Sequence, residues 1–71
     1  MDIRKLVGSN VQKQRLAANI SQEELAARMD VDQAYISRLE AGEKNPTIET
    51  LQAAATALGV DVQMFFVRYA K

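Results

Sequence analysis

Histidine and cysteine, which most often bind metals or carry nucleophilic and acid-base catalysis, are both absent from this sequence. Their absence removes the usual ligands for zinc and most transition metals, and it rules out a disulfide framework. The acidic residues form no clustered acid-base constellation. We therefore expect no enzyme, no metal and no cofactor.

The charges balance, with nine Lys and Arg against nine Asp and Glu, for a formal net charge of +0. A neutral chain argues against DNA binding, because attraction to phosphates supplies much of non-specific affinity. DNA binding therefore requires that the charges be segregated on the surface. The positions of the basic residues matter more than their number.

The chain has 71 residues, of which 48% are hydrophobic and 25% are charged. This size and composition predict one folded domain over residues 1–71. No run of about eighteen apolar residues is present, and the start lacks the apolar run of a signal peptide. We expect a cytoplasmic protein that does not enter a membrane.

The polar residues must be positioned by helices, because apolar residues recur at helical spacing and helix-capping residues precede them. A first helix is expected over residues 3–18, with Gly8 as a weak point. Four more are expected over 22–29, 33–40, 48–58 and 62–66, with the second ending at residue 28 or 29. Their N-caps are Ser21, Asp32, Thr47 and Asp61. The prediction is an all-α fold of five helices.

The second and third helices flank a tight turn and share an apolar face. Its members are Leu25, Ala26, Val31, Ile36 and Leu39. Ala26 is small enough for the third helix to cross closely, while Gln22, Gln33, Ser37 and Arg38 remain outside. Two short helices packed in this way are expected of a helix-turn-helix, whose second helix reaches base edges.

Four segments in order carry a family resemblance: SQEELA at 21–26, YISRLEAG at 35–42, NPT at 45–47 and ALGV at 57–60. Together they resemble the Cro/C1-type (Xre-like) phage repressor family over residues 11–66. The resemblance implies a five-helix lambda-repressor-like domain whose third helix enters the major groove of double-stranded DNA. One departure is Asp30, since the family usually has glycine there and the position tends to need a positive φ, which aspartate tolerates.

The resemblance also implies roles for individual residues. The residues expected to contact bases are Gln33, Ala34, Ser37 and Arg38, since glutamine can pair with adenine and arginine with guanine. The residues expected to contact phosphates are Gln22, Lys44 and Asn45. Arg15 and Glu40 match an internal ion pair between the first and third helices, with an ordinary surface bridge as the alternative.

The C-terminal segment 62–71 carries more apolar side chains than one side of a short helix can bury. We expect it to form a homodimer interface through Met64, Phe65, Val67 and Tyr69. Alternatively, these residues fold back onto the first helix and complete the core.

The sequence thus predicts a DNA-binding transcriptional regulator, a dimeric repressor that reads a palindromic operator. The neutral charge leaves one alternative from another class. In it, the chain is an antitoxin or adaptor whose apolar C-terminal surface binds a different protein.

Overall fold

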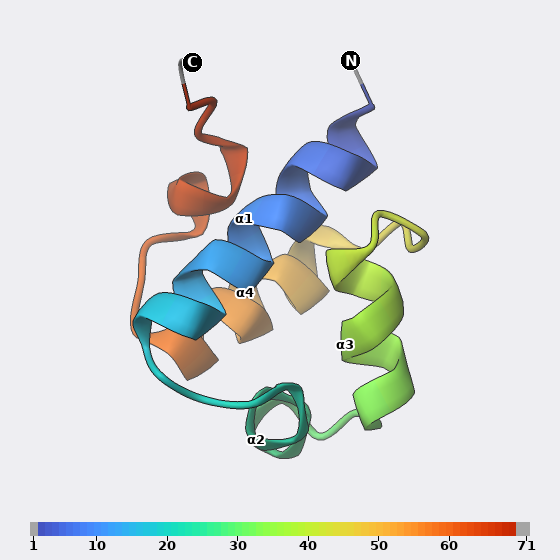
Figure 1. The fold of residues 1–71 in the computed structure, drawn as a ribbon, viewed down its shortest axis with the longest axis vertical. Coiled ribbons are helices and arrows are strands. Elements are labelled where there is room, and N and C mark those ends of the chain that lie inside the picture. Colours follow the sequence, from blue (N-terminus) through green and yellow to red (C-terminus); the bar gives the residue numbers. More distant parts are fainter. Residues whose placement is uncertain (1, 70–71) are drawn as a thin grey trace.

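The computed structural model describes residues 2–69, which form four α-helices and one 3-10 helix and contain no strand (Figure 1). The elements are α1 (Ile3–Ala17), α2 (Gln22–Met29), α3 (Gln33–Glu40), α4 (Ile48–Leu58) and the 3-10 helix η1 (Val62–Phe66). The first four lie where the sequence predicts helices, with α1 one residue shorter. Residues 70 and 71 of the expected dimerisation segment lie outside the described residues.

The fifth expected helix is η1, so the described residues hold four α-helices rather than five. Its five residues are too few for a sustained α-helical hydrogen-bond ladder. The backbone N–H of Met64 donates to the carbonyl of Asp61 three residues earlier, at 2.9 Å. This i to i+3 bond makes the tighter 3-10 turn.

Local side chains define where α2, α3 and α4 begin. Ser21 Oγ accepts from the backbone N–H of Glu24 at 3.0 Å, Asp32 Oδ1 from that of Tyr35 at 2.8 Å, and Thr47 Oγ1 from that of Thr50 at 3.0 Å. Each bond satisfies an N–H group that has no partner inside its own helix. The start of α3 is therefore set by Asp32 itself.

The core takes side chains from every helix. Its fully or almost fully buried apolar members are Val7, Val11, Leu25, Ala26, Ile36, Leu39, Leu51, Ala54, Ala55, Leu58 and Phe65. Phe65 has 0% exposure, so the expectation that it lies at a dimer interface is wrong. The aromatic ring fills the core of a single chain, as the alternative of a folded-back C-terminal segment requires.

A buried amide holds the C-terminal segment against α1, beside which it runs in Figure 1. Asn10 is buried, and its Nδ2 donates to the carbonyls of Phe65 at 2.9 Å and Val67 at 2.8 Å. Farther along, Lys13 Nζ lies 4.0 Å from the centroid of the Tyr69 ring. These contacts explain why η1 packs on α1 although it is only five residues long.

Helices α1 and α3 meet at Gly8, where no side chain separates the two backbones. A Cβ atom built on Gly8 would lie 2.2 Å from the Leu39 carbonyl oxygen and 2.9 Å from that of Glu40. The residue that reads as a weak point in α1 is therefore the point of closest approach to α3.

In the described part of the chain, no helix has the length and apolar character needed to cross a membrane.

Candidate nucleic-acid interface

The pair α2–α3 is joined by residues 30–32 alone. Asp30 ends α2 with φ 59° and ψ 43°, the left-handed conformation expected at this position. The backbone N–H of Val31 then donates to the carbonyl of Ala26 at 3.0 Å, which closes the turn. In Figure 1, α2 is seen nearly end-on while α3 runs along one edge of the molecule, so the two helices cross at a wide angle.

Helix α3 has one buried face and one solvent-exposed face. Ile36 and Leu39 are buried in the core. The four residues expected to contact bases, Gln33, Ala34, Ser37 and Arg38, are all exposed. Because these positions recur one turn apart, the structure brings them together on the outward side of the helix.

The residues expected to contact phosphates lie at both ends of this unit. Gln22 is the first residue of α2 and is partly buried, and its Nε2 donates to Glu40 Oε1 at 3.1 Å. Lys44 follows α3, with its Nζ 5.5 Å from the centroid of the Tyr35 ring, and Asn45 is exposed beside it. The Gln22 side chain is thus tied to the far end of α3.

Arg15 and Glu40 form a buried ion pair between α1 and α3. Arg15 Nε donates to Glu40 Oε2 at 2.6 Å and Nη2 to Oε1 at 3.1 Å, while Nη1 donates to the Ile20 carbonyl at 2.9 Å. The two side chains are only 9% and 2% exposed, unlike a surface bridge. The hydrogen bonds to Glu40 raise the pKa of Arg15, and burial opposes that shift. This pair fixes the end of α3 against α1.

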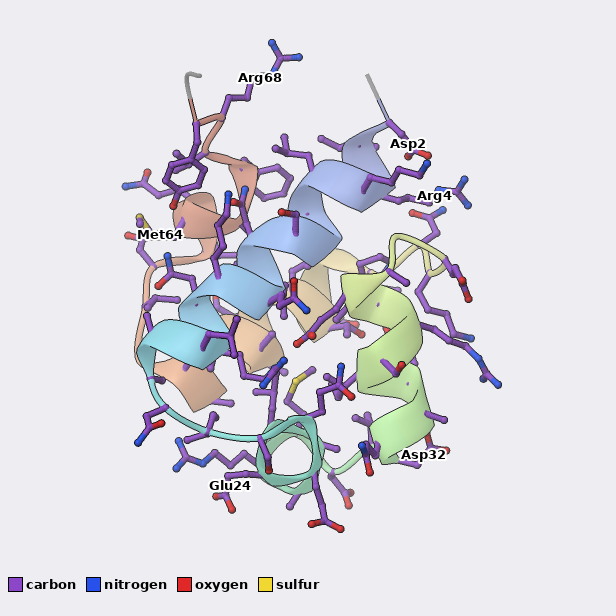
Figure 2. The ribbon with its side chains drawn as sticks, in the orientation of Figure 1. Asp2, Arg4, Glu24, Asp32, Met64 and Arg68 are labelled. Atoms are coloured by element: carbon purple, nitrogen blue, oxygen red, sulfur yellow. The ribbon has the colours of Figure 1, made fainter. Side chains whose placement is uncertain are left out.

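The charges near α3 are partly segregated. Arg38 and Lys44 form no ion pair with any of the described residues, whereas Arg28 is paired with Glu24 on α2 at 2.9 Å. Figure 2 places Glu24 and Asp32 at the end of the molecule far from the first turn of α1, where Arg4 lies. Asp32 also accepts the capping bond of α3, so its charge is partly offset by backbone N–H groups.

Two residues that position this unit were missed by sequence reasoning. Gly8 is a glycine inside an otherwise regular helix, which can indicate close packing. Because glycine has a low helix propensity, however, the same residue is also expected simply to weaken the helix. Asn10 gave a weaker signal, since it lies on the same helical face as Val7 and Val11 and is polar there. A polar residue on an apolar face is expected to hydrogen-bond inside the fold.

Two helices joined by a short turn, with polar side chains facing outward from the second, form the arrangement that DNA-binding helix-turn-helix proteins use. Residues 11–65 match the family model described as helix-turn-helix. An uncharacterised HTH-type transcriptional regulator, y4dJ of Sinorhizobium fredii, is 52% identical over 60 residues, which cover 84% of this chain and 78% of that regulator.

Two solved structures of restriction-modification controller proteins are also similar. The C.AhdI protein of Aeromonas hydrophila has a TM-score of 0.84 and 31% identity, over 92% of this chain and 93% of that one. The C.Esp1396I tetramer, solved in complex with its natural 35 base-pair operator, has a TM-score of 0.82 and 32% identity, over 93% and 87%.

The chain belongs to the helix-turn-helix family, which confirms the resemblance to Cro/C1-type regulators. It is a DNA-binding transcriptional regulator, from a family of regulators and not of enzymes. The comparisons do not favour the alternative of an antitoxin or adaptor.

Proposed function

We propose that this protein is a dimeric repressor that places α3 in the major groove of a palindromic operator, in the cytoplasm. The proposal depends on the two faces of α3: Gln33, Ala34, Ser37 and Arg38 are exposed on the outward face, while Ile36 and Leu39 are buried in the core. In this proposal α1 to α4, with η1 as the fifth element, form a lambda-repressor-like domain over the whole chain.

The proposed base contacts follow from side-chain chemistry. Gln33, the first residue of α3, can accept and donate to adenine, and Arg38 can donate twice to guanine. Ser37 and Ala34 lie between them on the same face, where a hydroxyl hydrogen bond and a thymine methyl contact suit their sizes. The absence of a carboxylate partner for Arg38 among the described residues supports this role.

The proposed phosphate contacts are Gln22, Lys44 and Asn45, at the two ends of the reading unit. Gln22 stands at the N-terminus of α2, where backbone N–H groups also favour an anion. Its hydrogen bond to Glu40 links that position to the end of α3. A contact at Gln22 therefore fixes the register of α3 relative to the DNA backbone without reading sequence.

An apolar surface supports dimerisation at the end of the molecule where α1 begins and η1 ends. Ile3, Ile48 and Phe66 are large and exposed, Ile48 to 84%. Ile3 and Phe66 also line a pocket of about 140 Å³, together with Val7, Pro46 and Leu51 and the polar residues Arg4 and Asn45. We propose that a second copy covers this surface, because the apolar side chains of the pocket lose contact with water when they are covered.

We propose that the edge of this dimer interface includes Met64, Val67 and Tyr69 as peripheral contacts. Residues 62–69 are then part of the dimerisation segment. Met64 and Val67 are partly buried and Tyr69 is exposed. Figure 2 shows Met64 on the side of the molecule away from α3. A two-fold pair reads two half-sites about one helical turn apart, which one short helix cannot do.

Selection of bound duplexes from a random pool tests the function. The expected product is a palindrome whose half-sites are spaced by about one helical turn, roughly 10 base pairs. A pool that never enriches would overturn the proposal, and a single unrepeated half-site would overturn the dimer.

The oligomeric state tests the interface separately. Ile48→Glu is expected to give monomers by sedimentation, because it places a charge on the proposed apolar surface. Ala53→Glu is the matched control, since it adds the same charge at an exposed position on a different face of α4. A dimeric Ile48→Glu variant, sedimenting as Ala53→Glu does, would remove Ile48 from the interface.

A further inference from the structure

The basic residues of this neutral chain divide into paired and unpaired groups. Within residues 2–69, Arg4, Arg15 and Arg28 each form an ion pair with a carboxylate. Lys5, Lys13, Arg38 and Lys44 form none with the described residues. Lys13 and Lys44 lie over tyrosine rings, which leaves their positive charge uncompensated by an acid.

Lys5 packs on the turn that connects Arg38 to Lys44, although it comes from α1. Gly42, buried with φ 79°, lies in the turn that follows α3. A Cβ atom on Gly42 would lie 2.9 Å from Lys5 Cα and 2.6 Å from Lys5 Cγ. The Lys5 stem therefore packs on this turn, while the residue as a whole remains exposed.

The first turn of α1 lies beside this turn, which itself packs on the end of α3. Arg4 and Asn45 line the same pocket, and Figure 2 shows Arg4 next to the turn between α3 and α4. The backbone N–H of Glu43 donates to the Arg38 carbonyl at 2.9 Å, which folds the turn back on the end of α3. Lys5, Arg38 and Lys44 thus come from segments that pack against one another, and we call these three residues the cationic strip.

We propose that Lys5 is a further DNA-phosphate contact, which extends the cationic strip from α3 and its turn onto the first turn of α1. The inference rests on the proposed entry of α3 into the major groove, because that entry brings the strip to the DNA backbone. Glu43 is the acid exposed in the same turn, and it opposes three cations. Three cations without acidic partners favour the binding of a polyanion, because each phosphate that they neutralise releases counterions.

The experiment measures the affinity of the selected duplex as a function of salt for wild type, Lys5→Ala, Lys5→Arg and Lys13→Ala. Lys13 is the matched control, because it is an exposed lysine of the same helix that lies outside the strip. Since Lys13 lies over Tyr69 of the proposed dimerisation segment, sedimentation verifies that Lys13→Ala keeps the wild-type oligomeric state. Each phosphate contact contributes about 0.9 to the slope of log affinity against log salt. Circular dichroism verifies that each variant is folded.

With two copies on one operator, Lys5→Ala is expected to lower the magnitude of this slope by about 1.8. The ratio of wild-type to variant affinity then falls roughly 12-fold when salt rises about fourfold. Lys5→Arg is expected to keep the wild-type slope, and so is Lys13→Ala.

An unchanged slope for Lys5→Ala overturns the inference, even where affinity at one salt concentration falls. An equal loss for Lys13→Ala also overturns it, because the effect would then follow net charge rather than position. A wild-type protein that binds no duplex at low salt overturns the proposed function itself.

Discussion

Replacing Gly8 with alanine separates what a helix prefers from what this fold requires. Gly8 lies inside α1, where alanine is favoured over glycine by about 1 kcal/mol in an ordinary helix. The new Cβ atom would lie 2.2 Å from the Leu39 carbonyl oxygen, which belongs to the backbone of α3. Helix propensity and packing therefore predict opposite signs for the same substitution.

The geometry decides which effect is larger. Ordinary contact for a Cβ atom begins at 3.4 Å, so a contact of 2.2 Å requires the backbones of α1 and α3 to separate by 1.2 Å. Overpacking of a well-packed core costs about 3 kcal/mol at the upper end of its usual range, and both clashing groups here are backbone. After the gain in propensity, we expect Gly8→Ala to lower the free energy of unfolding by about 2 kcal/mol.

Chemical denaturation followed by circular dichroism measures this change, and the melting temperature should fall by about 10 °C. Gln12→Gly is the control, because Gln12 is an exposed position of the same helix and should lose only about 1 kcal/mol. A Gly8→Ala variant as stable as wild type, or more so, would refute the close approach of α1 to α3.

Three further substitutions test the contacts that position the site. Glu40→Gln leaves Arg15 charged and buried without its partner, so the free energy of unfolding should fall by about 3–5 kcal/mol. Replacing Arg15 and Glu40 together with leucine should lower the free energy of unfolding by less than Arg15→Leu alone or Glu40→Leu alone. A double variant less stable than both single ones would contradict this. Asn10→Ala leaves the buried carbonyl of Phe65 and the partly buried carbonyl of Val67 without this donor, at about 1–3 kcal/mol for the buried group, and the C-terminal segment should become protease-sensitive. Unchanged proteolysis would count against the clamp. Asp2 has its pKa lowered from 3.8 by the backbone N–H of Arg4, so its stabilising effect should be present above pH 3.8 and lost as pH falls through the lowered pKa. The stability difference between wild type and Asp2→Asn should shrink only in that acidic range, and a difference that is constant with pH would disprove the shift.

The starts and ends of the helices could be predicted from the sequence because the interactions that set them are local. Ser21, Asp32 and Thr47 each cap a helix within three residues of themselves. The left-handed conformation of Asp30 likewise depends on its place at the end of α2. Such contacts are readable without knowledge of the rest of the fold.

Contacts between distant segments were harder to predict. The apolar surplus at the C-terminus indicates that something must be buried, but it does not show which ring points inward. Phe65 lies in the core and the adjacent Phe66 is exposed, because Asn10 holds the backbone of this segment against α1. A similar limit applies to Gly8, whose role depends on a backbone 31 residues away at Leu39.

The outward residues of α3 could be predicted once the turn and its apolar partners were assigned, since exposure follows from helical periodicity. The buried pair of Arg15 and Glu40 came instead from family resemblance, because 25 residues separate the two. The participation of Gln22 in that network could not be predicted, since it depends on the distance between the start of α2 and the end of α3.

Base reading by the exposed face of α3 is tested by the affinity of Arg38→Ala for the selected operator and its single-base variants. The variant is expected to lose discrimination at one position of each half-site, by about 1–3 kcal/mol, and to keep wild-type preferences elsewhere. Equal weakening on every duplex would contradict base reading and make Arg38 a phosphate contact.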